Sequence, residues 1–249
     1  KKEAIKWSYE YVTQVLGISP ERITVTVFAG DPSASSGQAV PYDEESFNIW
    51  HKEIGLPVSK ISKRGRAENF WGPTGNEGPC GPTTEIYVNG IEIWNVVFNQ
   101  YYQKADKTLD PLETPGIDTG MGLERLVATM QGVEDVFQTD LFQPIIKVID
   151  ETAPALKDRE VRIFADHLRA SVFLIADGVR PSNKEAGYIL RRLLRRILAY
   201  QTIYDVHGDL FAAAHEVVKE KFCKIYPEVN DPRILEVMES EKDKFETMI

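Results

Sequence analysis

The stretch from Thr83 to Gln100 constrains the fold of this chain more than any other part of its 249 residues. Two runs rich in β-branched residues, 83–88 and 91–100, flank the dipeptide Asn89-Gly90. Asn-Gly between two such runs favours a β-hairpin with a type I′ turn, because both turn positions need a positive φ. We therefore expect a hairpin here, with its second strand inside a sheet.

The turn also predicts which side chains share a face, because successive residues of a strand point to opposite sides of the sheet. The pairs expected on one face are Val88–Ile91, Ile86–Ile93 and Thr84–Asn95. The residues expected on the other face are Glu85, Glu92, Trp94 and Phe98. Asn95 then shares its face with Val97, and such a polar side chain is either a satisfied core amide or a ligand contact.

Residues before the hairpin predict two helices and one strand, joined by irregular segments. The expected helices cover 2–16 and 43–54, the expected strand covers 22–29, and the expected loop covers 31–41. Gly17 and Gly55 would end the two helices. Residues 66–82 are dense in Gly and Pro, so irregular backbone is expected there, and on general statistics Trp71 within them is a core aromatic.

From about residue 141 the pattern predicts helices only. The expected helices cover 141–151, 160–177, 183–204, 210–225 and 231–248, with a kink at Pro144 in the first of them. This change places a domain boundary near Asp140 and predicts two domains, 1–139 and 140–249. The fold class is therefore expected to be α+β, with a sheet and flanking helices followed by an all-α domain.

Composition excludes several classes of protein. The net charge of -9 argues against indiscriminate nucleic-acid binding, so any RNA contact needs a local basic patch. Two cysteines give no disulfide framework, and the four histidines show no metal-ligand spacing with them, so we expect no metal site built from these residues. No apolar run reaches membrane-spanning length, and a reducing cytoplasm without membrane contact fits the chain.

The stretch from Gly116 to Leu126 combines glycines with charged residues. Glycines precede an apolar helical pattern, so a tight turn that leads into a helix is expected. Asp118 before the turn and Arg125 in the helix would then face one site from opposite sides, which suits an ammonium and a phosphate. Alternatively, the Asp caps the helix and the Arg pairs with a surface carboxylate.

A basic stripe lies on the helix expected over 183–204. Its arginines are Arg191, Arg192, Arg195 and Arg196. Four-residue spacing places them on one polar face opposite several leucines. They form either a solvated face neutralised by carboxylates such as Glu185 or an RNA-binding surface. Just before them, Asn183 is the expected N-cap of the helix.

Three stretches together carry a family resemblance. They are 116–126 with its Asp-Thr-Gly-Met-Gly-Leu-Glu-Arg run, 78–86 with Gly-Pro-Cys-Gly-Pro-Thr-Thr-Glu-Ile, and 176–183 with Ala-Asp-Gly-Val-Arg-Pro-Ser-Asn. The first resembles the third signature motif of class II aminoacyl-tRNA synthetases in the form carried by alanyl-tRNA synthetases, and the resemblance runs through the whole chain. It implies an antiparallel class II sheet. It also implies ATP-dependent activation of alanine and transfer of alanine to the terminal ribose of alanine tRNA.

The resemblance also implies roles for particular residues. The residues implied to line the alanine pocket are Trp71, Asn95, Val97, Asp118 and Gly120. Asp118 would hold the substrate ammonium, and Gly122 and Arg125 would bind ATP. Magnesium would accompany the ATP, but its ligands stay unassigned because the expected register turns Glu85 and Glu92 away from Asn95.

In the helical half, the resemblance makes Asn183 the reader of the G·U pair in the acceptor stem of alanine tRNA, with Arg191, Arg192, Arg195 and Arg196 as further tRNA contacts. An amide can both donate and accept at the minor-groove edge of RNA, whose deep groove is closed to side chains.

The chain departs from the family pattern because the first two class II motifs, which normally precede the position of Lys1, and the editing and C-terminal domains are absent from it. The chain alone is therefore expected to be inactive in adenylate formation. A missing N-terminal segment or a second copy is an expected partner. The alternative is a non-catalytic module that binds tRNA or an amino acid.

Overall fold

The computed structural model describes residues 1–31 and 39–248, and most of the loop expected over 31–41 lies outside them. The chain forms two compact units, Lys1–Met130 and Gln131–Ile249. The division lies before Asp140 because residues 131–139 belong with the helices. Asp135 caps the short turn Val136–Gln138 and forms an ion pair of 2.5 Å with Arg162.

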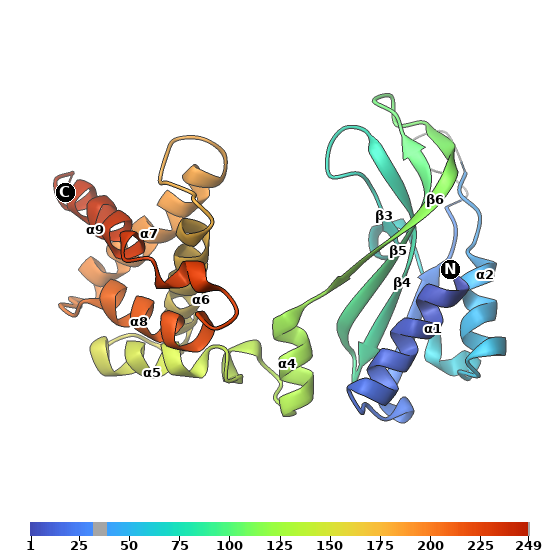
Figure 1. The fold of residues 1–249 in the computed structure, drawn as a ribbon, viewed down its shortest axis with the longest axis horizontal. Coiled ribbons are helices and arrows are strands. Elements are labelled where there is room, and N and C mark those ends of the chain that lie inside the picture. Colours follow the sequence, from blue (N-terminus) through green and yellow to red (C-terminus); the bar gives the residue numbers. More distant parts are fainter. Residues whose placement is uncertain (32–38, 249) are drawn as a thin grey trace. The chain divides into compact units, whose positions relative to one another are not determined.

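The first unit is built on a mixed sheet whose main strand order is β2-β1-β4-β5-β6, with β3 paired to β4 (Figure 1). The strands are β1 Ile23–Phe28, β2 Ile61–Arg64, β3 Phe70–Trp71, β4 Gly78–Val88, β5 Ile91–Gln103 and β6 Leu109–Met121. The expected antiparallel sheet is present except at one edge, where β2 runs parallel to β1. A crossover through helices joins these two strands, and such a connection permits parallel pairing.

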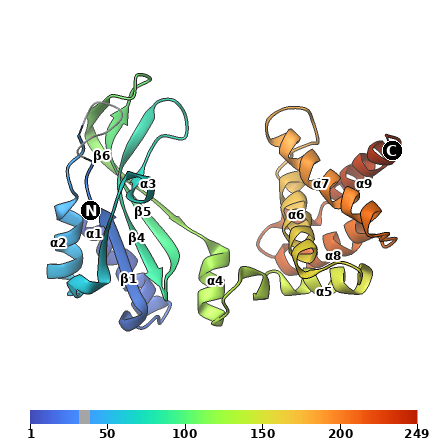
Figure 2. The ribbon, with the colours of Figure 1, turned by 180° about the vertical axis from the view of Figure 1, so that it is seen from behind.

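Two helical segments cover one face of this sheet (Figures 1 and 2). They are α1 Lys2–Glu10 with its π-helical continuation Tyr11–Val15, and α2 Glu44–Asn48 with its continuation Ile49–Glu53. Gly17 and Gly55 end them at φ 68° and 87°, as expected from the sequence. The buried core between helices and sheet includes Ile5, Val12, Val25, Val27, Trp50, Ile86, Val88, Val96 and Phe98.

The segment expected to be irregular, 66–82, holds more regular structure than its composition indicated. It contains the short helix α3 Arg66–Asn69, then β3, and then the start of β4 at Gly78. Gly81 explains the glycine content in part, because a Cβ there would overlap the Phe98 carbonyl oxygen of β5. The close approach of the two strands therefore requires glycine at this position.

The hairpin turn is confirmed, and the register beyond it is wrong by one residue. Asn89 and Gly90 have φ values of 50° and 84°, as a type I′ turn requires, and Val88 lies opposite Ile91. Ile93 is then left without a partner in β4. The pairs that follow this β-bulge are Ile86–Trp94, Glu85–Asn95, Thr84–Val96 and Thr83–Val97. One inserted residue exchanges the two faces of a strand, so Asn95 and Glu85 lie on the same face.

The glycine-rich stretch is a strand and not the expected turn. Residues 109–121 form β6, which pairs with β5, and Gly116 and Gly120 lie in it. Only after Gly122 does the chain enter the expected helix, α4 Leu123–Gln131. The pairing of β6 with its neighbour outweighs the low strand preference of glycine.

The second unit is helical, as expected. Its helices are α5 Gln143–Thr152, α6 Asp158–Ala176, α7 Glu185–Ile203, α8 Leu210–Phe222 and α9 Arg233–Glu246. Pro144 lies in the first turn of α5, where it needs no hydrogen-bond donor, so it starts the helix and does not kink it. The buried residues of α6 include Phe164 and Leu168, and those of α7 include Leu190 and Leu194. Among the described residues of both units, no helix has the length and apolar character needed to cross a membrane.

Candidate active site

Polar side chains from four strands share the sheet face opposite α1 and α2, which we call the site face. It carries Thr26 of β1; Thr83, Glu85 and Tyr87 of β4; Glu92, Asn95 and Val97 of β5; and Asp118 and Gly120 of β6. The bulge at Ile93 brings this set together, because it places the β5 residues after it on the same side as Glu85. The candidate site and the apolar core therefore lie on opposite sides of one sheet.

Four of the five residues expected to form the alanine pocket lie side by side on the site face. Val97 pairs with Asp118, and Asn95 pairs with Gly120. The Asp118 side chain is exposed, and its Oδ1 accepts a hydrogen bond of 2.8 Å from the backbone N–H of Thr119. The Asn95 Oδ1 is buried and has no hydrogen-bond partner in the described part of the chain. An unpaired buried carbonyl oxygen next to a carboxylate is suited to receive an N–H donor.

The fifth residue, Trp71, lies in β3 opposite Gly81 of β4 and is half-buried. Gly81 precedes Thr83 of the site face by two positions, so the backbone of Trp71 lies near the end of that face. Its neighbour Phe70 packs on Phe28, with ring centroids 5.5 Å apart. The packing of Phe70 and the pairing of β3 with β4 therefore hold the backbone of Trp71 in place.

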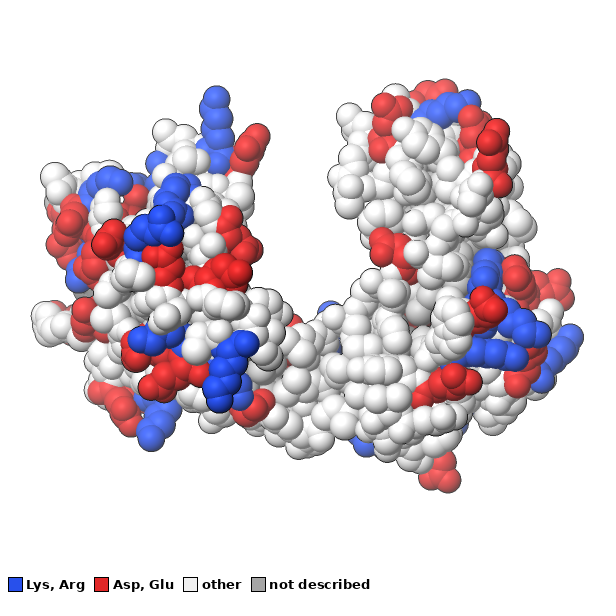
Figure 3. All heavy atoms as spheres, in the orientation of Figure 1, with Lys and Arg blue, Asp and Glu red and all other residues white. Residues whose placement is uncertain are grey.

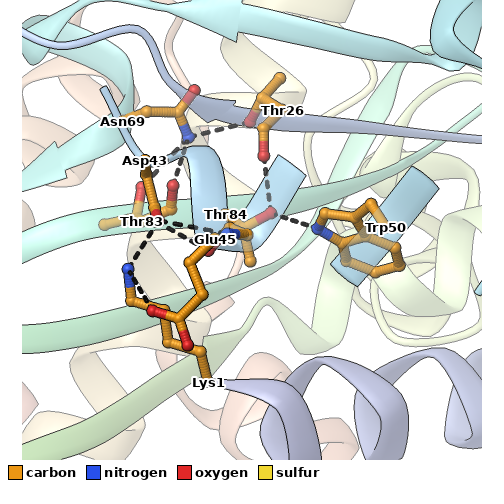
Figure 4. Close-up of polar contacts among 9 residues, drawn as sticks. Lys1, Thr26, Asp43, Glu45, Trp50, Asn69, Thr83 and Thr84 are labelled. Atoms are coloured by element: carbon orange, nitrogen blue, oxygen red, sulfur yellow. Dashed lines mark hydrogen bonds and ion pairs between the residues drawn. The ribbon is translucent and has the colours of Figure 1, made fainter. Parts of the chain in front are cut away.

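A buried hydrogen-bonded network lies beneath the site, and the sequence analysis did not anticipate it. The Asn69 amide donates to the hydroxyl oxygens of Thr26 (2.9 Å) and Thr83 (3.1 Å), as Figure 4 shows. Thr26 donates to Glu85 Oε2 at 3.0 Å, and the Tyr87 hydroxyl donates to the same oxygen at 2.8 Å. One feature of the sequence could have indicated this network, because Glu85 is a single carboxylate among the otherwise uncharged residues of β4.

On the opposite face of the sheet, toward α1 and α2, further hydrogen bonds reach the same strands β1 and β4. Trp50 donates from its indole nitrogen to the Thr84 hydroxyl at 2.8 Å, and Thr84 donates to the carbonyl oxygen of Thr26 at 2.6 Å (Figure 4). At the start of the chain, the Lys1 ammonium pairs with the buried Asp43 carboxylate at 2.6 Å. The Trp50 bond therefore holds the continuation of α2 against β4, and the Lys1 pair joins the start of α1 to the start of α2.

Burial raises the pKa of the Glu85 carboxyl, although the hydrogen bonds from Tyr87 and Thr26 act in the opposite direction and the Glu92 charge adds to the rise. The pKa of the Tyr87 hydroxyl is also raised, by burial first and then by its bond to Glu85. Glu85 is only 5% exposed. Its chemistry is therefore that of a fixed acceptor within the floor of the site.

We expect Glu85→Gln to remove a pH dependence of stability. A raised pKa means that the folded chain holds this proton more tightly than the unfolded chain, so the stability from Glu85 is full below its unfolded pKa and is lost as pH rises through the folded value. The thermal midpoint of the wild type should therefore fall relative to Glu85→Gln as pH rises from the ordinary pKa of a glutamate, about 4.3, through the higher pKa of the folded state. Thermal unfolding followed by circular dichroism at a series of pH values measures the difference.

Two further variants act as controls for this prediction. Glu85→Leu strands the hydroxyls of Thr26 and Tyr87 and should lower the free energy of unfolding by about 1–3 kcal/mol. Glu77→Gln changes an exposed carboxylate just before β4 and should leave the midpoint unchanged. Parallel pH profiles for the wild type and Glu85→Gln would contradict the buried role of this carboxyl.

Arg125 and Glu92 form the second charged feature of the site face. Arg125, in the first turn of α4, donates to the Glu92 carboxylate at 2.9 Å. Gly122 lies beside the aliphatic stem of Arg125, where a Cβ would make an ordinary van der Waals contact at 3.7 Å, so the pair does not require glycine at this position. The expectation that Glu85 and Glu92 turn away from Asn95 is wrong, since the bulge returns both to its face.

In the helical unit, the arginines of the basic stripe have different partners. Arg195 donates from Nε to the buried Glu241 carboxylate of α9 at 2.6 Å, so it joins two helices. Arg192 and Arg196 are exposed, and Arg196 lies over the Tyr200 ring at 5.9 Å. Asn183 is also exposed, and it is not the N-cap, because α7 begins at Glu185 with Lys184 before it. Basic and acidic side chains are interspersed on the face of this unit in Figure 3.

Comparisons with known proteins agree over the full length of the chain. A family model described as tRNA synthetases class II (A) matches residues 1–249. The alanine–tRNA ligase of Thermotoga maritima is 40% identical over 274 residues, covering 98% of this chain and 30% of the relative. That of Rubrobacter xylanophilus is 42% identical (98% and 31%), and that of Treponema pallidum is 39% identical (98% and 44%).

The chain thus spans less than half of the length of these relatives. Within that span, β6 and α4 carry the stretch from Gly116 to Leu126, β6 is paired with β5, and the helical unit carries the basic stripe. The sheet geometry, the family match and the relatives agree, and the chain belongs to the class II (A) tRNA synthetases.

Proposed function

We propose that this chain supplies the alanine pocket and the acceptor-stem recognition surface of an alanine–tRNA ligase. One observation carries the proposal: Asn95, Val97, Asp118 and Gly120 are direct neighbours across β5 and β6. The relatives named alanine–tRNA ligase support the choice of substrate. A tRNA substrate fits the cytoplasmic location expected from the sequence.

Each pocket residue has a role that follows from its chemistry. The Asp118 carboxylate pairs with the substrate ammonium, and the unpaired Asn95 Oδ1 accepts a second N–H from it. Val97 is 6% exposed and offers an apolar contact to a methyl group. Gly120 adds no side chain to the space beside Asn95. The alanine carboxylate then attacks the α-phosphate of ATP, which forms alanyl-adenylate and releases pyrophosphate.

Arg125 is the cation that would meet the ATP phosphates, with Gly122 beneath its stem. When bound, Mg²⁺ would offset phosphate charge. Glu92 fits as a protein ligand, because it is a carboxylate on the site face beside Arg125 and Mg²⁺ needs only one or two such groups. Glu85 fits less well, since burial raises its pKa. No cluster of three metal-ligating side chains occurs within 1–31 and 39–248.

Pyrophosphate exchange tests the pocket in a protein extended to the length of its relatives. Alanine should support exchange, and serine and glycine should support it measurably, because an added hydroxyl or a missing methyl changes transition-state binding by only about 1–3 kcal/mol. Leucine, which needs far more room beside Val97, should not support it. Exchange that is equal with leucine and alanine, or absent with alanine, would refute the proposed substrate.

The exposed residues of the helical unit should have two different roles in duplex binding. Asn183 should recognise a base pair, whereas Arg192 should bind phosphate in any duplex. Arg192→Ala should weaken binding of every acceptor-stem duplex and reduce the salt dependence of binding by about one phosphate contact. Asn183→Ala should instead remove the preference for a G·U over a G·C pair and leave the salt dependence unchanged. Titration of labelled duplexes with the 249-residue chain at several salt concentrations measures both effects. Equal losses on both duplexes for Asn183→Ala would contradict the reader role.

A further inference from the structure

The loop that carries Asn183 starts from a fixed helix end. After α6, the Val179 N–H donates to the Leu174 carbonyl oxygen and the Gly178 N–H to the Ile175 carbonyl oxygen, both at 3.0 Å. This is a Schellman motif, and Gly178 supplies its left-handed position at φ 89°. Arg180 adds hydrogen bonds from its guanidinium to the carbonyl oxygens of Ile175 (3.1 Å) and Val179 (2.9 Å).

The other end of the loop is clamped onto the first turn of α7. The Ser182 N–H donates to the Gly187 carbonyl oxygen at 3.0 Å. The Ser182 hydroxyl donates to the Lys184 carbonyl oxygen at 2.9 Å and accepts from the Lys184 N–H at 3.3 Å. Both neighbours of Asn183 in the chain are thus bonded to each other.

Gly187 makes this clamp possible. It is buried in α7, and a Cβ there would overlap the Ser182 hydroxyl and the Arg180 carbonyl oxygen, and would lie 2.9 Å from the Ser182 Cβ. The loop backbone therefore crosses directly over the Cα of Gly187. Because one of the overlapping atoms is a backbone oxygen, the loop cannot admit any side chain at position 187 by a change of rotamer alone.

Asn183 has no part in these bonds. Its side chain is exposed, and within the residues that the structure covers it makes no hydrogen bond. The usual use of an Asn at this place, as a helix N-cap, is not made, since Lys184 takes that position. A free amide on a fixed backbone is the arrangement that a base reader needs, because its donor and acceptor must meet one base edge.

We propose that Ser182 and Gly187 are positioning residues that hold the Asn183 amide in place for discrimination between base pairs. This inference rests on the proposed reader role of Asn183 and adds a physical cause for its precision. A mobile Asn183 would meet G·U and G·C pairs in many orientations, and the difference in affinity would average out. The arginine anchors do not depend on the loop and would still bind the duplex.

The test compares G·U and G·C acceptor-stem duplexes with variants of the 249-residue chain. Gly187→Ala should lower the G·U/G·C affinity ratio by about fivefold or more, as Asn183→Ala does, while affinity for the G·C duplex changes less than about twofold. Ser182→Ala leaves the space intact and removes only the hydroxyl bonds, so it should lower the ratio partly. The double variant Ser182→Ala/Gly187→Ala should not recover the ratio, because the Arg180 carbonyl oxygen still overlaps the new methyl group.

Ala186→Gly is the matched control. It weakens the same helical turn through backbone entropy but leaves the clamp, so it should keep the wild-type ratio. Hydrogen exchange gives a second measurement, in which the Ser182 and Lys184 amides should lose protection in Gly187→Ala and keep it in Ala186→Gly.

The outcomes separate the two proposals. If the wild type shows no preference for G·U, or Asn183→Ala keeps it, the reader role fails and this inference fails with it. If Asn183→Ala loses the preference while Gly187→Ala and Ser182→Ala both keep it, the reader role stands and the positioning role is overturned. A ratio lowered equally by Ala186→Gly would also overturn it, because general loosening of α7 would then be the cause.

Discussion

Asp118→Asn should lower kcat/KM for alanine-dependent pyrophosphate exchange by roughly 30- to 150-fold, in a protein extended to the length of its relatives. In the proposed pocket, the carboxylate offers a full negative charge to the substrate ammonium, whereas an amide offers only a dipole and directs two N–H groups toward a cation in one of its two orientations. The size and shape of the side chain are unchanged. The loss therefore measures charge and not packing.

Asp110→Asn is the control for this prediction. Asp110 lies in the same strand and forms an exposed ion pair of 2.7 Å with Lys104. Exposed pairs contribute little, so its replacement should change kcat/KM less than about twofold. Wild-type kinetics for Asp118→Asn at subsaturating alanine would remove Asp118 from the pocket.

Arg195→Ala should destabilise the helical unit by about 3 kcal/mol. The reason is the partner that remains, because the Glu241 carboxylate is 3% exposed and would stay buried without a counter-charge. Arg192→Ala, three residues earlier on the exposed side of α7, should change the free energy of unfolding by less than about 0.5 kcal/mol. Both arginines belong to the same basic stripe in the sequence, but only the replacement of Arg195 should lower the free energy of unfolding substantially.

Urea unfolding can assign this effect to one unit. All four tryptophans lie within residues 1–130, so tryptophan fluorescence follows the sheet unit, whereas circular dichroism is dominated by helices. Arg195→Ala should shift the circular dichroism transition and leave the fluorescence transition in place. Replacing both members of the pair, as Arg195→Met/Glu241→Leu, should restore most of the loss. An unshifted circular dichroism transition in the single variant would refute the structural role of Arg195.

Sequence features that act within a few residues predicted much of the fold. The parts that were not predicted depend on pairing between segments that are distant in the sequence. Asn89-Gly90 fixed the hairpin turn, and Gly17 and Gly55 marked the helix ends, because each requirement acts within a few residues. The bulge at Ile93 has no comparable local signal, so the register after it was wrong. The strand at 109–121 was missed for a similar reason, since its pairing with β5 depends on residues distant in the chain.

The candidate site likewise contains one feature that the local sequence predicted and one that depends on long-range pairing. Asn95 and Val97 were expected on one face because they are two residues apart in one strand, and that expectation holds. The network beneath them was not expected, because Glu85 meets Thr26 only through the pairing of β4 with β1, and Asn69 reaches them from a separate helix. No periodicity in the sequence reports contacts of this kind.

The unpaired Ile93 also determines which changes of chain length the protein can tolerate. Single-residue deletions are usually inexpensive next to a surface turn. Removing Ile93 would leave Glu92 opposite Tyr87 and Trp94 opposite Ile86, so regular alternation would return while Asn95 and Val97 stay on the site face. Removing a second residue from this part of β5 would turn both side chains into the apolar core and Val96 toward the site face. Descendants of this sequence should therefore tolerate the loss of one residue here and not the loss of two.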